Sequence, residues 1–164
     1  MELPVKFSPR PLRARAEAVL PVAAAICLAA TGCIAAGALR AQEAGHSIWD
    51  GVYTAAQAQR GAAEYTDRCA TCHGETLAGN GNDAPALTGK MFLNDWDGLT
   101  LTALFDRIHT TMPQSNPGTL SGQVAADLTA YLLSVNQLPA GPKELTDDAQ
   151  SLENIHFDAK KPSH

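Results

Sequence analysis

The sequence predicts a small all-α fold in which three main helices and their connecting loops surround a single binding site. Apolar and small residues recur at helical spacing over residues 54–69, 101–112 and 121–136. The intervening segments are rich in glycine, proline and asparagine, and we find no internal repeat and no convincing strand pattern. The 164 residues therefore hold one small domain with additional segments at both ends.

The first helix is predicted to begin after Thr54, because Thr54 and Gln57 have the spacing of a capping box. Along it, small or apolar residues keep a helical period, at Ala58, Gly61, Ala62, Tyr65 and Cys69. This helix leads directly into a pair of cysteines.

Two further helices follow a loop that contains Gly74, Gly79, Gly81 and Pro85. The middle helix is indicated by an apolar stripe at Leu101, Leu104, Phe105 and Ile108, and it ends at Met112–Pro113 because a residue before proline disfavours helix. The last helix begins near Ser121, and its stripe consists of Val124, Leu128, Tyr131, Leu132 and Val135.

These patterns divide the chain into a leader at residues 1–41, a lead-in segment at 42–53, a domain at 54–136 and a polar, acidic tail at 137–164. The tail contains four large apolar residues that would let it lie on the domain surface: Leu145, Leu152, Ile155 and Phe157.

The leader has the features of an export signal. Basic residues precede an uncharged, alanine-rich run at 19–39, and Ala41 is a small residue suited to cleavage. The leader could be cleaved after Ala41, be retained as one membrane anchor, or be replaced by a lipid attached at Cys33. We rank lipid attachment last, because the residues before Cys33 match a lipobox poorly.

Cys69, Cys72 and His73 form a Cys-x-x-Cys-His motif, the arrangement by which c-type haem is attached covalently. Two intervening residues place the sulfurs about one helical turn apart, within reach of the two thioether positions at one porphyrin edge. His73 would bind the iron through a neutral ring nitrogen, and its other ring nitrogen needs an acceptor. The motif predicts one haem c, held by Cys69 and Cys72.

Two other interpretations of the cysteine pair are weaker. A structural zinc site needs a second pair of ligands, and the other cysteines, Cys27 and Cys33, lie in the apolar leader. A thioredoxin-like dithiol would need neighbouring strands, whereas the flanking sequence is helical and rich in alanine.

Beyond residue 41 the chain has seven lysines and arginines against fifteen aspartates and glutamates, a net charge of −8. This acidity disfavours nucleic acid and anionic lipid as partners. We expect a protein partner with a positive or largely neutral docking patch, and contact with a membrane only if the leader is retained or lipidated.

Taken together, residues 54–136 resemble a class I, single-haem c-type cytochrome domain of the bacterial exported type. The resemblance implies that the Pro85 carbonyl accepts the His73 Nδ1 proton, that Leu87 packs on the haem edge, and that Met112 is the distal ligand. It further implies that Gly61 and Tyr65 belong to a first helix that the last helix crosses closely. Residues 49–53 and 107–114 resemble small bacterial cytochromes, some of them associated with quinoprotein dehydrogenases.

Met112 is also favoured by its chemistry, because a soft thioether needs no deprotonation and suits ferrous iron. The alternative is that Met112 is apolar filler and the iron is five-coordinate or takes another ligand. Met91 is expected in the core and His109 on the solvent side of its helix. For Trp49 and Trp96 we expect loop packing, with a hydrogen bond to a haem propionate as the alternative.

The sequence therefore predicts an exported, periplasmic one-electron carrier and not an enzyme, because a full ligand set stands without a recognisable array of acid, base or nucleophile. Its donor and acceptor would be redox proteins, with a quinoprotein dehydrogenase or a respiratory-chain oxidase as candidate partners. One alternative is a haem peroxidase or gas sensor with a labile distal ligand. Another is a membrane-tethered subunit of a dehydrogenase complex.

Overall fold

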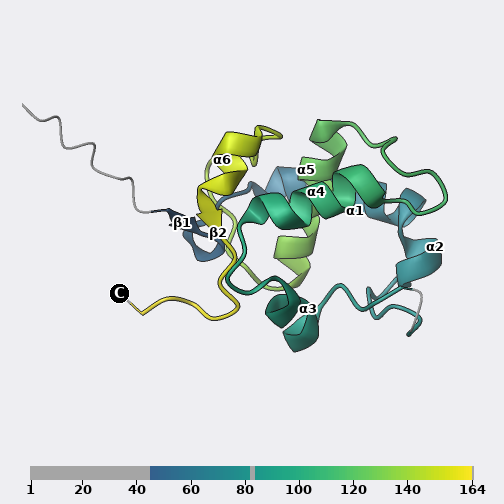
Figure 1. Ribbon diagram of the computed structural model, residues 1–164, viewed down its shortest axis with the longest axis horizontal. Helices are drawn as coiled ribbons and strands as arrows, with labels where there is room; N and C mark the ends of the chain where they lie inside the picture. Colours follow the sequence, from purple (N-terminus) through teal and green to yellow (C-terminus); the bar gives the residue numbers. More distant parts are fainter. Residues whose placement is uncertain (1–44, 82–83, 164) are drawn as a thin grey trace, which may run out of the picture. The chain divides into compact units, whose positions relative to one another are not determined.

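The computed structural model describes residues 45–81 and 84–163, so the predicted leader with Cys33 lies outside the described residues (Figure 1). Helices dominate this part of the chain, as predicted. In order, its elements are β1 (His46–Ser47), η1 (Ile48–Asp50), α1 (Ala55–Arg68), α2 (Ala70–His73), α3 (Gly89–Trp96), α4 (Leu101–Thr111), α5 (Gly122–Val135), α6 (Ala149–Glu153) and β2 (Ile155–His156). No helix in this part is long and apolar enough to cross a membrane.

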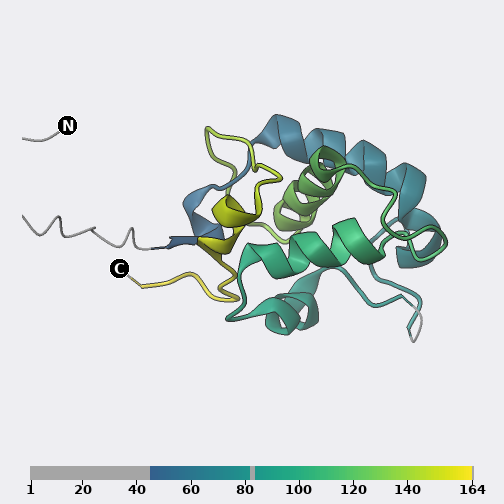
Figure 2. The ribbon, with the colours of Figure 1, turned by 45° about the horizontal axis from the view of Figure 1, so that its top comes forward.

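The main helix contact joins α1 and α5, which run across one another in Figure 2. A glycine makes this contact possible. A Cβ atom on Gly61 would lie 2.6 Å from the Asp127 carbonyl carbon and 2.8 Å from the Tyr131 Cβ. Since even the smallest side chain would overlap the α5 backbone, the two helices can approach this closely only at glycine.

The N-terminus of α1 forms only half of the predicted capping box. The Thr54 side chain accepts from the Gln57 N–H at 3.1 Å, as expected. The Gln57 side chain, however, is fully buried and bonds Leu145, donating to its carbonyl at 2.8 Å and accepting from its N–H at 2.7 Å. Gln57 thus joins α1 to the C-terminal segment instead of closing the cap.

The middle and last helices lie where they were predicted, but of the predicted stripe on α5 only Leu128 and Leu132 are buried, and that helix also buries residues outside the stripe, such as Ala125, Thr129 and Leu133. α4 buries the four residues of its predicted stripe and ends directly before Met112, while α5 is capped by the Ser121 hydroxyl, which accepts from the Val124 N–H.

The expected core position of Met91 is wrong, because its side chain is 76% exposed. Residues 89–96 form the helix α3, on which Phe92 and Trp96, four residues apart, share the inward face. Met91 is turned about 100° away from Phe92 around the helix axis and points to solvent.

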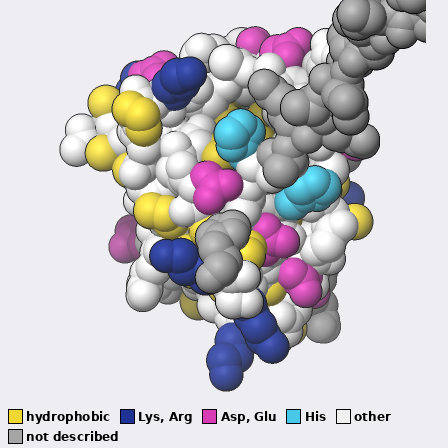
Figure 3. Space-filling view, turned by 90° about the vertical axis from the view of Figure 1, so that its left-hand side faces the viewer, with side chains coloured by type: hydrophobic (Ala, Val, Ile, Leu, Met, Phe, Trp, Pro, Cys, Tyr) yellow, Lys and Arg dark blue, Asp and Glu magenta, His cyan; other side chains and the backbone are white. Residues whose placement is uncertain are grey.

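The C-terminal segment is more deeply integrated than the sequence indicated. Leu145, Leu152, Ile155 and Phe157 are each at most 8% exposed and belong to the same hydrophobic core as the helices. Two very short strands, which the sequence did not reveal, also join the two ends of the described chain. β1 and β2 pair in parallel, with His46 opposite Ile155. The face seen in Figure 3 carries acidic, basic and histidine side chains side by side rather than a field of one sign.

Candidate functional site

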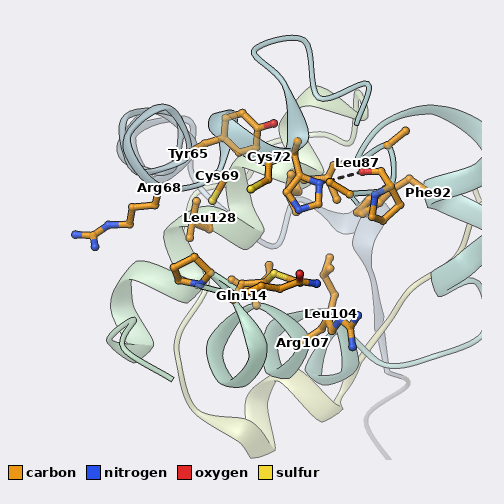
Figure 4. Close-up of a pocket in the computed structure, with 18 of the residues that line it drawn as sticks. Tyr65, Arg68, Cys69, Cys72, Leu87, Phe92, Leu104, Arg107, Gln114 and Leu128 are labelled. Carbon is orange, nitrogen blue, oxygen red and sulfur yellow. Dashed lines mark hydrogen bonds between the residues drawn. The ribbon is translucent and has the colours of Figure 1, made fainter. Parts of the chain in front are cut away.

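All six predicted site residues line one cavity of about 630 Å³, drawn in Figure 4. They are Cys69, Cys72, His73, Pro85, Leu87 and Met112. The structure therefore brings together three segments that are separated by up to 43 positions in the sequence.

The first wall of the cavity is built where α1 passes into α2. Cys69 ends α1, and its N–H donates to the Tyr65 carbonyl at 2.9 Å. Its own carbonyl accepts from the N–H groups of Cys72 at 3.1 Å and His73 at 2.9 Å. Cys69 and the single turn α2 that follows it thus present both thiols and the imidazole to the cavity from five consecutive residues.

The loop after α2 fixes the histidine ring. His73 Nδ1 lies 3.0 Å from the Pro85 carbonyl oxygen, so a proton on Nδ1 is donated there and Nε2 remains available to bind a metal. The loop closes tightly because Gly79 has φ +70° and lies against the backbone of residues 84–86. A Cβ atom on Gly79 would come within 2.6 Å of the Pro85 carbonyl carbon, so glycine is needed to place this acceptor.

The second wall follows α4. Figure 4 shows Leu104 and Gln114 across the cavity from Cys69, Cys72 and Leu87. Met112 lies on this side, directly after α4, with its N–H donating to the Ile108 carbonyl at 3.2 Å. A thioether and an imidazole are thus presented from different elements to the same space.

Burial governs the ionisation of groups at the first wall. Burial raises the pKa of the Cys69 thiol to about 11, so in the chain without haem this cysteine is a neutral thiol at pH 7. Burial also raises the pKa of Tyr65 to about 12, and its hydroxyl donates to the Gly74 carbonyl at 2.6 Å. The tyrosine is therefore a neutral structural donor that joins α1 to the residue after α2.

Most of the apolar lining was not foreseen as part of the site. It comes from three pairs at four-residue spacing, one on each of α3, α4 and α5: Phe92 and Trp96, Leu104 and Ile108, and Leu128 and Leu132. The sequence signal was present in the helical stripes, but periodicity alone does not separate core packing from the lining of a cofactor cavity.

Of Trp96, Trp49 and His109, only Trp96 lines the cavity. Trp96 lines the cavity and packs on Phe92, with ring centroids 6.4 Å apart. Trp49 is not among the lining residues, and its Nε1 donates to the Asp158 carbonyl at 2.9 Å. His109 is also outside the lining and packs against Phe105 at 5.4 Å, partly buried rather than fully solvent-facing.

The chemistry of this donor set fits a covalently attached haem. Two thiols stand on one turn, the adjacent imidazole has a fixed tautomer, and a thioether and an apolar surface complete the cavity. Within the described part of the chain, no group of three or more histidine, cysteine or carboxylate side chains forms another candidate metal centre.

The match of this chain to a protein family agrees with this fit. Residues 56–132 match the family model described as cytochrome c oxidase, cbb3-type, subunit III. No curated protein is a significant match. Among solved structures, the sulfane dehydrogenase SoxCD from Paracoccus pantotrophus aligns with a TM-score of 0.46 and 24% identity, over 66% of this chain and 61% of that chain. The family match, together with the motif and helices it spans, identifies the domain: this chain carries a monohaem class I c-type cytochrome domain, whose cofactor is one covalent haem c.

Proposed function

We propose that the chain is an exported one-electron carrier in which His73 and Met112 are the axial ligands of the haem iron. Electron transfer is the activity of a c-type cytochrome domain. The observation that supports this ligand pair is the His73–Pro85 hydrogen bond, which leaves one ring nitrogen for the iron, in a cavity that also contains Met112. When bound, the haem supplies a ferric/ferrous couple that takes up and releases one electron.

The residues around the cavity favour a carrier over a catalyst. Asp95 is the only carboxylate among the described residues that line it, and that residue is exposed. Cys69 and Cys72 would be consumed by the thioether bonds, and the Nδ1 proton of His73 is committed to Pro85. No side chain in this described lining is thus arranged as a general acid and base pair for substrate chemistry.

Export supports the same proposal. Residues 1–41 have the composition of an export signal, and thioether attachment of haem in bacteria takes place outside the cytoplasmic membrane, as the cytochrome resemblance implies. We therefore propose a periplasmic protein, either soluble or anchored by its N-terminal segment.

The partners we propose are redox proteins, with a quinoprotein dehydrogenase or a respiratory oxidase as donor or acceptor. The net charge of −8 beyond residue 41 favours a partner with a positive or neutral docking patch. If charge attraction guides docking, the second-order rate of electron transfer should fall as ionic strength rises. A rate that rises with salt would contradict a positive docking patch on the partner.

The axial ligand is tested by comparing two methionine variants of the mature holoprotein. In Met112→Ala we expect loss of the weak methionine-to-iron absorption band at the red end of the ferric spectrum, a lower reduction potential and new binding of carbon monoxide. Met91→Ala is the matched control, because Met91 is 76% exposed, and it should behave like the native protein.

Two outcomes would contradict the proposal. An unchanged spectrum in Met112→Ala would remove this residue as ligand. Rapid, tight carbon monoxide binding by the native reduced protein at neutral pH would instead favour a peroxidase or gas sensor with an open distal position.

A further inference from the structure

One wall of the haem cavity has little support from the helix bundle. Helix α3 contributes Phe92 and Trp96 to the cavity, and Phe92 is only 2% exposed. Yet α3 makes only scattered backbone contacts with the other described helices and lies at the edge of the bundle in Figure 1. Its aromatic face is therefore held against the cavity by side-chain packing in the common core, to which residues outside the helices, Phe157 among them, also contribute.

Part of that support comes from residues 155–159, which we call the C-terminal strap. The ring of Phe157 is fully buried and meets the ring of Phe92 edge to face, with centroids 6.2 Å apart. Phe92 in turn packs on Trp96 at 6.4 Å. A continuous row of three aromatic rings therefore runs from the strap to the cavity.

The strap is also hydrogen-bonded to the residues that directly follow α3. The Phe157 carbonyl accepts from the Gly98 N–H at 2.9 Å, and the Phe157 N–H donates to the Leu99 carbonyl at 2.8 Å. The Asp97 carboxylate accepts from the Ala159 N–H at 2.7 Å. These bonds fix the C-terminal end of α3 to the strap.

On its other side the strap is held by the lead-in segment. β2 pairs with β1, the Ser47 hydroxyl donates to the Asp158 carboxylate at 2.5 Å, and Trp49 Nε1 donates to the Asp158 carbonyl. The strap thus lies between the end of α3 and the lead-in segment. Both segments stand outside residues 56–132, the part that matches the cytochrome family.

We propose that Phe157 is a positioning residue of the haem site, which holds Phe92 and Trp96 in the cavity wall and so raises the reduction potential of the haem. An apolar wall excludes water and disfavours the more highly charged ferric form. Loosening the wall admits water and stabilises ferric haem. This inference rests on the proposed placement of the haem in the cavity lined by His73 and Met112.

The test is a redox titration of the full-length holoprotein and its Phe157→Ala variant. At a fixed solution potential, the variant should have a ferric-to-ferrous ratio at least about threefold higher, which for one electron is about 30 mV lower in midpoint potential. Hydrogen exchange of the α3 amides should also become faster. Leu145→Ala is the matched control, because Leu145 is equally buried in the C-terminal segment but bonds α1 through Gln57 and does not line the cavity.

Leu145→Ala should lower the melting temperature without moving the midpoint potential. If both variants shift the potential equally, or if Phe157→Ala leaves it at the native value, Phe157 has only a structural role and the inference is wrong. Should Phe157→Ala yield no holoprotein, Phe157→Leu carries the test, with a smaller shift in the same direction expected and no shift overturning it. Failure of the His73 and Met112 assignment is recognised separately, in the native spectrum and in Met112→Ala.

Discussion

Replacing Gly61 by alanine should destabilise the protein, although alanine is normally the better helix residue. In an exposed helix interior the change would gain up to about 1 kcal/mol. Here the added Cβ would stand 2.6 Å from the Asp127 carbonyl carbon and 2.8 Å from the Tyr131 Cβ, about 1 Å inside the optimal carbon–carbon separation of about 3.5–4.0 Å. The obstacle is mainly the α5 backbone, which cannot rotate away.

Overpacking of a core costs about 1–3 kcal/mol, and contact with backbone places this site at the upper end. After subtracting the propensity gain, we expect about 2 kcal/mol of net destabilisation, or about 8 °C in melting temperature for a domain of this size. Thermal unfolding of the holoprotein, followed by circular dichroism, measures it.

The matched control is Gly122→Ala, also in a helix, where the nearest atom is the carboxylate end of the exposed Asp147 side chain, which can move. This control should be close to neutral. A melting temperature of Gly61→Ala equal to or above the native value would show that α1 and α5 are not in the contact described.

Three further predictions concern the hydrogen bonds between Gln57 and Leu145, the ion pair of Arg60 and Asp127, and the cofactor. Gln57→Ala leaves the buried N–H and carbonyl of Leu145 unpaired and should lower the free energy of unfolding, measured with denaturant, by about 2–4 kcal/mol. The control Gln59→Ala, at an exposed position, should be neutral. Equal unfolding midpoints for the two variants would contradict the role given to the Gln57 hydrogen bonds. Burial alone raises the pKa of Asp127, but hydrogen bonds, chiefly from Arg60, outweigh it and leave that pKa below its usual value. The charged Asp127 therefore stabilises the folded protein above its unfolded pKa of about 3.9, and this stabilisation is lost as the pH falls through the folded pKa. Between pH 5 and pH 3 the melting temperature of the native protein should therefore drop more steeply than that of Arg60→Gln. Replacing both haem cysteines by alanine should yield little folded protein, since so small a domain has little core without its cofactor, and a native-like thermal transition in that haem-free variant would refute this.

Local sequence signals were enough to predict the three main helices, α1, α4 and α5, and the residues of the motif, but they did not reveal α3 or α6. The stripe from Leu101 to Ile108 predicted α4, and Thr54 and Ser121 predicted the starts of α1 and α5, because period and capping depend on neighbours within a few positions. The Cys-x-x-Cys-His motif likewise specified its cofactor, since the spacing of its sulfurs is set by a single turn.

The same local signals failed where a side chain had two possible partners. Gln57 fits a capping box equally well by sequence, but a buried backbone pair 88 positions away took its amide instead. Met91 and Phe92 are neighbouring apolar residues, and only the rotation of α3 about its axis decided that Phe92 is buried and Met91 is exposed.

The sequence by itself determined the all-α class, the covalent haem and the pair of helices that glycine allows to cross. Only the tertiary structure decided that one cavity is lined from three helices as well as the motif, and that the acidic tail supplies Phe157 behind α3. The reason is physical: helix period and thiol spacing are fixed by bonds and contacts along the chain, whereas the wall of a cavity depends on distant segments whose burial is favourable only when they meet.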